Sequence, residues 1–223
     1  MVSDIHDAEY FEGLQREVRA HNHDLYLAHL FVPADKRHSF IYLAHYYCEL
    51  EIIRRSESEL MLRLIRVQWW LDQFEKMRDG ESGGLPMADY WLAHNLPIIW
   101  LENLAQHTMD ELDGEADPSL NPNATSPLFA NIADLLGYDL SGDIAIDAAC
   151  GFWSDSVKLD MRDARFPMLK TAINAKTRAQ RKTLMPILVL IKLARRRDRS
   201  QPKTTNALAD LLSLVWIAIW GRL

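Results

Sequence analysis

Cysteine, long apolar runs and strand-like alternation are all scarce in this sequence of 223 residues. The two cysteines, Cys48 and Cys150, lie in apolar helical contexts, which argues against a disulfide framework and indicates reduced thiols in a cytosolic compartment. No apolar run reaches the ~20 residues needed to span a bilayer. The first residues lack the charged-then-apolar pattern of a signal or transit peptide. We therefore expect a cytoplasmic protein.

Period-two alternation with turn signals is also missing, and no repeat of 20–50 residues occurs, so we find neither a sheet nor a solenoid. At 48% hydrophobic and 25% charged residues, the composition is that of an ordinary globular protein. The sequence predicts an all-α fold with a single domain over residues 1–223. Its one strong linker, rich in proline, asparagine and acids, is the irregular stretch 113–127.

Two long helices joined by a short polar corner are the clearest local prediction. The first spans 34–54 and is apolar on more than one face, so we expect it to be central and buried. The second starts after the signature at 56–59 and ends before Asp79. An earlier helix is predicted over 9–19, with Asp7 as its N-cap.

Later in the chain, a short helix is expected to end at Gly137. Pro186 either kinks a helix that begins before it or marks that helix's true start.

Charge is unevenly distributed along the chain. Residues 1–157 hold 10 Lys and Arg against 27 Asp and Glu, whereas residues 158–223 hold 15 against 4. The basic end suits an anionic membrane surface, with Trp216 and Trp220 beside apolar helices, or it belongs to core helices with solvated arginines facing the acidic body of the fold. Basic and aromatic residues do not interleave as in a nucleic-acid face, so we expect no nucleic-acid partner.

Glu49 and Glu51 lie near the end of the first long helix. Carboxylates one turn apart can hold Mg²⁺ against a diphosphate, because this cation prefers oxygen ligands. One turn beyond Glu51, however, stands Arg55, which cannot ligate a cation and is placed for an i,i+4 ion pair with Glu51. His45 and Glu49 also have metal-ligand spacing, but no third ligand completes a site, so we expect a hydrogen-bonded histidine instead.

The second long helix carries Arg66, Gln68, Trp70 and Asp72 within two turns. Arg66 can stack on Trp70 or pair with an acid of the preceding helix. These residues form either a structural polar network or a ligand-facing surface. A second charged cluster, which includes Asp155 and Arg162, is either a metal or phosphate site or an exposed helix end.

Several of these segments together resemble the squalene/phytoene synthase family. The likeness rests on DLYLAHLFVP at 24–33, Arg37, the Glu-Leu pair at 49–50 and IRVQWWLD at 65–72. It is strongest over 22–78 and weaker over 151–167. The chain looks most similar to a non-catalytic branch of the family, which includes a mitochondrial respiratory complex I assembly factor and short bacterial relatives.

The resemblance implies an isoprenoid-synthase-like helical bundle. Active members of the family join two prenyl diphosphates head to head and use two aspartate-rich motifs to hold Mg²⁺. The first motif falls on Glu51 and Arg55, where one position keeps its charge and the other reverses it. The second falls near Asp155 and does not match in register. A fixed positive charge where a metal cluster needs a negative one disfavours prenyl transfer.

We therefore expect a non-catalytic assembly or support factor for a membrane respiratory complex, with complex I first. The implied partners are a respiratory-complex subunit and, through the basic C-terminal end, the inner-membrane surface. The alternatives are a prenyltransferase of this family, which would need Mg²⁺, and a module that binds an isoprenoid or lipid without chemistry. No cofactor is expected otherwise. The candidate residues of a cavity are Arg37, Glu49, Glu51, Arg55, Arg66, Gln68, Trp70, Asp72, Asp155 and Arg162.

Overall fold

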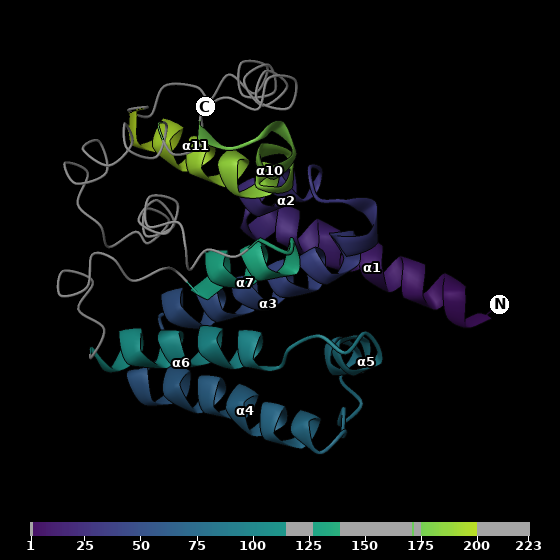
Figure 1. Cartoon of the computed structure of the whole chain (residues 1–223). Coiled ribbons are helices and arrows are strands. Elements are labelled where there is room, and N and C mark those ends of the chain that lie inside the picture. Colours follow the sequence, from purple (N-terminus) through teal and green to yellow (C-terminus); the bar gives the residue numbers. More distant parts are fainter. Residues whose placement is uncertain (1, 115–126, 139–170, 172–174, 200–223) are drawn as a thin grey trace. The chain divides into compact units, whose positions relative to one another are not determined.

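The computed structural model describes residues 2–114, 127–138, 171 and 175–199, and its regular elements in these ranges are all helices (Figure 1). The all-α prediction is confirmed. The chain forms two compact units, one of residues 1–21 and 41–117 and the other of residues 22–40 and 118–223. That the whole chain is a single domain stays a prediction, and most of the expected linker lies outside the described residues.

The first unit begins with α1 (Val2–His21), which is longer than the helix predicted over 9–19. Asp7 lies inside α1, so its prediction as the N-cap is wrong. The residues before Glu9 include neither proline nor glycine, and acids in the first turns of a helix suit the positive end of its dipole. Leu14 and Val18 are buried and pack α1 into the core.

The helix α3 (Arg37–Arg55) follows a 3₁₀ turn, η1 (Ala34–Lys36), so the predicted start at residue 34 was three residues early. Four consecutive side chains, those of residues 41–44, are at most 8% exposed. Because successive residues of a helix point about 100° apart, four buried in a row require neighbours on several sides. The expectation that this helix is central is confirmed.

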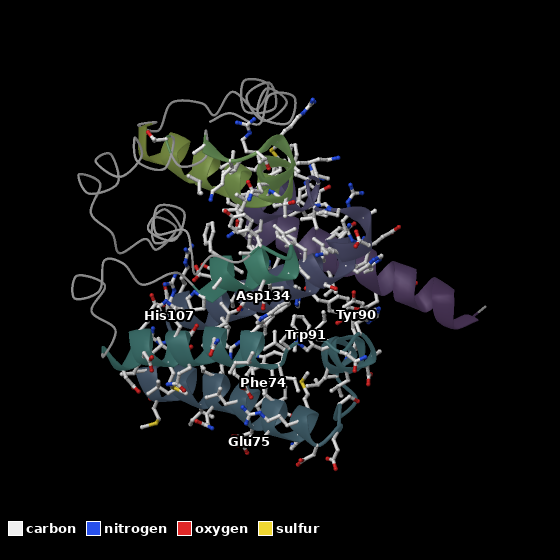
Figure 2. All side chains as sticks on the ribbon, in the orientation of Figure 1. Phe74, Glu75, Tyr90, Trp91, His107 and Asp134 are labelled. Carbon is white, nitrogen blue, oxygen red and sulfur yellow. The ribbon has the colours of Figure 1, made fainter. Side chains whose placement is uncertain are left out.

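Two further helices pack against each other in the first unit: α4 (Leu60–Arg78) lies along α6 (Ile99–Asp113) (Figure 1). Near the end of α4, Arg78 pairs with Glu102 of α6 at 2.6 Å. Phe74 of α4 points into the interior, as does Trp91 of the short α5 (Pro86–Ala93) (Figure 2). The indole nitrogen of Trp91 donates a hydrogen bond to the carbonyl of Pro97 at 3.2 Å, which satisfies the buried polar atom of this large ring.

The second unit contains α2 (His23–His29), α7 (Pro127–Leu135), α10 (Arg178–Thr183) and α11 (Met185–Arg199), and α11 packs against α2. Pro186 is the second residue of α11, so it belongs to a helix start and not to a kink. Residues 184–191 are all buried. This stretch is therefore core, as one of the two alternatives held, while Trp216 and Trp220 lie outside the described residues.

The end of α7 is fixed by a glycine, as predicted. Gly137 has φ +74°, a left-handed conformation that costs a residue without a side chain little. Its amide donates to the carbonyl of Asp134, and the amide of Tyr138 donates to that of Ala133, both at 2.8 Å. The ammonium of Lys36 donates to the carbonyl of Leu135 at 2.7 Å, so η1 is tied to the end of α7.

Candidate functional site

The carboxylate of Glu51, at the end of α3, is held between two guanidinium groups. Its Oε1 lies 2.5 Å from Nη2 of Arg54, and its Oε2 lies 2.8 Å from Nη2 of Arg55. Arg54 also donates to Oε2 of Glu111 in α6, at 2.9 Å. The i,i+4 ion pair predicted for Glu51 and Arg55 is confirmed, and it is one part of a network that joins α3 to α6.

Burial distinguishes the two arginines of this network. Burial by itself acts to lower the pKa of Arg54, but the carboxylates of Glu51 and Glu111 outweigh it and the pKa is raised. Arg54 is thus a fixed cation whose side chain is 24% exposed, whereas that of Arg55 is 66% exposed. The inner guanidinium contributes more to holding the helices together, because water screens the outer one.

This geometry bears on the diphosphate chemistry of the family that the sequence resembles. A metal-binding carboxylate must offer its oxygens to a cation, but both oxygens of Glu51 already accept from guanidinium groups. Within the described ranges, no group of three or more His, Cys, Asp and Glu side chains is arranged to hold a metal ion. The position of Glu51 is therefore occupied by an ion-pair network.

Glu49, two residues before Glu51, is half-buried on α3. Next to it lies the buried thiol of Cys48. Burial of the thiol, together with the negative charges of Glu51 and Glu49, raises the pKa of Cys48 to about 12. The prediction of a core thiol at this position is confirmed, and the thiol stays protonated at physiological pH; Cys150 lies outside the described residues.

The four candidates on α4 divide between the interior and the surface. The indole of Trp70 packs against the rings of Tyr46 and Phe74, with centroids 5.1 and 6.0 Å apart. The side chains of Arg66, Gln68 and Asp72 are exposed, and the amide of Gln68 donates to Asp72 at 2.8 Å. Trp70 thus belongs to an aromatic cluster between α3 and α4, and the polar residues lie on the outer surface of α4.

Arg37 belongs to the second unit, where it closes a turn. Its Nε donates to the carbonyl of Val32 at 2.9 Å, and Nη2 lies 3.4 Å from the carbonyl of Leu30. This role is structural, because the guanidinium satisfies backbone groups ahead of α3. Asp155 and Arg162 lie outside the described residues, so the second predicted cluster stays a prediction, as does a ligand-binding role for the whole set.

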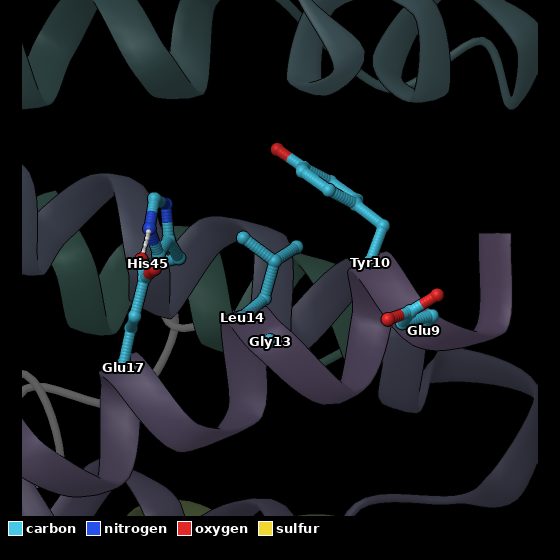
Figure 3. Close-up of a pocket in the computed structure, with 6 residues that line it drawn as sticks. All are labelled: Glu9, Tyr10, Gly13, Leu14, Glu17 and His45. Carbon is cyan, nitrogen blue, oxygen red and sulfur yellow. Dashed lines mark hydrogen bonds and ion pairs between the residues drawn. The ribbon is translucent and has the colours of Figure 1, made fainter. Parts of the chain in front are cut away.

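A pocket of about 430 Å³ lies in the first unit, between α1 and α3 (Figure 3). It is lined by Glu9, Tyr10, Gly13, Leu14, Glu17 and His45. Nε2 of His45 lies 2.6 Å from Oε2 of Glu17, and the two side chains point toward each other. His45 therefore pairs with a carboxylate on α1, not with Glu49 on its own helix. Of the candidate residues that the structure describes, none lines this pocket.

The lining of the pocket is acidic. Among the described residues that line it, two carry carboxylates, Glu9 and Glu17, and none is a lysine or arginine. Burial, and then the charge of Glu17, raises the pKa of Tyr10, so its phenol remains a hydrogen-bond donor. Such a wall suits a cationic group far better than a diphosphate. Sequence spacing gave no signal for this pocket, because Glu17 and His45 are 28 residues apart and meet only through helix packing.

The chain is similar to curated proteins named NADH dehydrogenase (ubiquinone) complex I, assembly factor 6. It is 29% identical to the human and bovine proteins and 30% identical to the mouse protein, over 139 residues in each case. The matched region is 57% of this chain and 42% of each relative, so the chain spans less than half the length of these proteins. No family model and no solved structure matches the chain.

Proposed function

We propose that this protein is an assembly factor for respiratory complex I and carries out no prenyl-transfer chemistry. The observation that carries the proposal is the similarity to the human, bovine and mouse proteins named as complex I assembly factors. The partner that this function requires is a subunit or subcomplex of complex I. The isoprenoid-synthase-like bundle implied by the sequence resemblance remains part of the proposal.

The ion-pair network between α3 and α6 supports a non-catalytic role. Prenyl transfer in this family would need a carboxylate free to hold Mg²⁺ where Glu51 instead accepts from Arg54 and Arg55. Placing a divalent cation there would require both ion pairs to open and would leave the half-buried guanidinium of Arg54 beside the metal, a repulsion that is large in a partly buried setting. The pocket between α1 and α3 offers a diphosphate an acidic wall.

Contact with a membrane is a further part of the proposal, through the basic C-terminal end. Among the helices that the structure describes, none is both long and apolar enough to cross a bilayer. Binding at the surface would be electrostatic, so we expect the protein to bind vesicles containing anionic lipid at low salt and to be released as salt rises. Failure to bind such vesicles at low salt would remove the membrane from the list of partners.

Deletion of the gene tests the main proposal. Complex I should fall in native gels and in NADH-oxidation assays, while other respiratory complexes are unchanged, and the wild-type gene should restore it. A second assay tests for prenyl-transfer activity: purified protein is incubated with farnesyl or geranylgeranyl diphosphate and Mg²⁺, and condensed product is sought. Unchanged complex I in the deletion strain would overturn the assembly role, and condensed prenyl product would show that the protein is a prenyltransferase.

A further inference from the structure

The first three turns of α4 expose a row of large apolar side chains. Met61 is 65% exposed, Leu62 52%, Ile65 56% and Trp69 45%. We call these four residues the α4 stripe. Exposed apolar residues are ordinary when they are scattered, but a contiguous group marks a surface that another molecule covers.

The stripe is additional to the face of α4 that packs into the first unit. At about 100° per residue, Met61, Ile65 and Trp69 step around the helix by about 40° each, and together with Leu62 they fall on one face about 100° wide. Val67 and Phe74 point to the opposite side and are buried.

Farther along the same outer surface the residues are exposed and charged, as Asp72 and Lys76 are, so solvent is the ordinary environment of this side of α4. The core therefore does not require apolar residues in the stripe.

Charges around the stripe are of mixed sign. Glu57 and Glu59 lie at its start, Arg66 at its side and Asp72 at its end, and all four are exposed. An apolar centre with a rim of both signs is the composition of a protein–protein interface. A helix that lies on anionic lipid carries a predominantly basic rim, whereas three of these four groups are acidic and would be repelled.

The same charges disfavour pairing of the stripe with a second copy of itself. If two copies of α4 ran antiparallel about Ile65, Asp72 of each would face residue 58 of the other, between Glu57 and Glu59. If they ran parallel, each acid would face its own counterpart. Either arrangement brings like charges together at the edge of the contact, which is destabilising.

We propose that the α4 stripe is the docking surface for an amphipathic helix of a different protein. The charges specify this helix: an apolar seam two to three turns long, basic residues opposite Glu57 and Glu59, and an acid opposite Arg66. Trp69 and Met61 are residue types that are enriched at such interfaces. The inference deepens the proposed function, on which the identification of the partner as a complex I subunit rests.

Site-specific photocrosslinking in the cells that express the full chain tests the inference. The photoreactive residue p-benzoylphenylalanine replaces Ile65 in one strain and, as the matched control, Glu75 on the charged part of the same helix. We expect an adduct with one protein from position 65 at least tenfold above that from position 75, with mass spectrometry identifying a complex I subunit. The double variant Glu57→Lys, Glu59→Lys, carrying the same photoreactive residue at position 65, should reduce the adduct at least tenfold while its circular-dichroism spectrum stays that of the folded protein.

The possible outcomes separate the two proposals. A charge-dependent adduct with an identified protein outside complex I keeps the docking surface and counts against the assembly function. An adduct with a second copy, with another segment of the same chain or with lipid overturns the inference. So does an adduct from position 65 that does not exceed the one from position 75, or one that the charge reversal leaves unchanged.

Discussion

Replacement of Arg54 by methionine is the sharpest test of the ion-pair network between α3 and α6. The side chains of Glu51 and Glu111 are 17% and 16% exposed, so each carboxylate depends on a partner. Without Arg54, Glu51 keeps Arg55, but the described part of the chain leaves Glu111 with only the imidazole of His107, 3.7 Å away. Methionine preserves much of the apolar stem, so the change removes the charge and its hydrogen bonds more than the packing.

The expected loss follows from burial. Breaking a buried ion pair by removing one partner costs about 3–5 kcal/mol. Because Arg54 is 24% exposed, we expect less, about 2–3 kcal/mol. The matched control is Arg55→Met, which removes the other guanidinium from Glu51 but at a side chain 66% exposed, so we expect a loss below about 1 kcal/mol.

Urea unfolding followed by circular dichroism at 222 nm measures the difference. With a slope of about 2 kcal/mol per molar, the midpoint of Arg54→Met should fall by about 1 M and that of Arg55→Met by less than about 0.5 M. The pKa of Arg54 is raised, so its contribution is complete below the ordinary pKa of an unfolded arginine and is lost as pH rises from there through the raised pKa of the folded state.

The difference in the free energy of unfolding between wild type and Arg54→Met should therefore be the same at pH 7 and pH 9. Equal losses for the two arginine variants would refute the argument from burial.

Four further changes have defined outcomes. Phe74→Ala removes a fully buried ring and should cost about 3–5 kcal/mol in urea unfolding, with a smaller loss contradicting its place in the core. Since the pKa of Cys48 is raised to about 12, its thiol should resist iodoacetamide in the native state at pH 8, and its contribution to stability should decline above about pH 9, where the unfolded thiol ionises first. Trp91→Phe loses the hydrogen bond to the carbonyl of Pro97 and should lower the free energy of unfolding by about 1–3 kcal/mol. Gly137→Ala places a side chain at φ +74° and should lower the free energy of unfolding by about 1–2 kcal/mol. A thermal melt with an unchanged midpoint would contradict this expectation.

The sequence by itself determined the features that depend on residues close together along the chain. Apolar residues on more than one face identified α3 as central, and Gly137 marked a helix end. Pro186 was compatible with a kink or a helix start, and only the structure places it in the first turn of α11. The pair of Glu51 and Arg55 was predictable because residues four apart on a helix always lie close together. The candidate positions on α3 were thus identifiable as charged groups before their surroundings were known.

Contacts between helices distant in sequence were decided by tertiary structure alone. No sequence pattern near Glu111 or Glu17 indicated their partners. In the structure, Glu111 completes the ion-pair network at Arg54, and Glu17 pairs with His45.

The apolar pattern of α4 was visible in the sequence, but it did not show that Val67 would be fully buried while Leu60 is 44% exposed. Helical periodicity fixes which side chains share a face, whereas only the packing of neighbouring helices determines which face is covered.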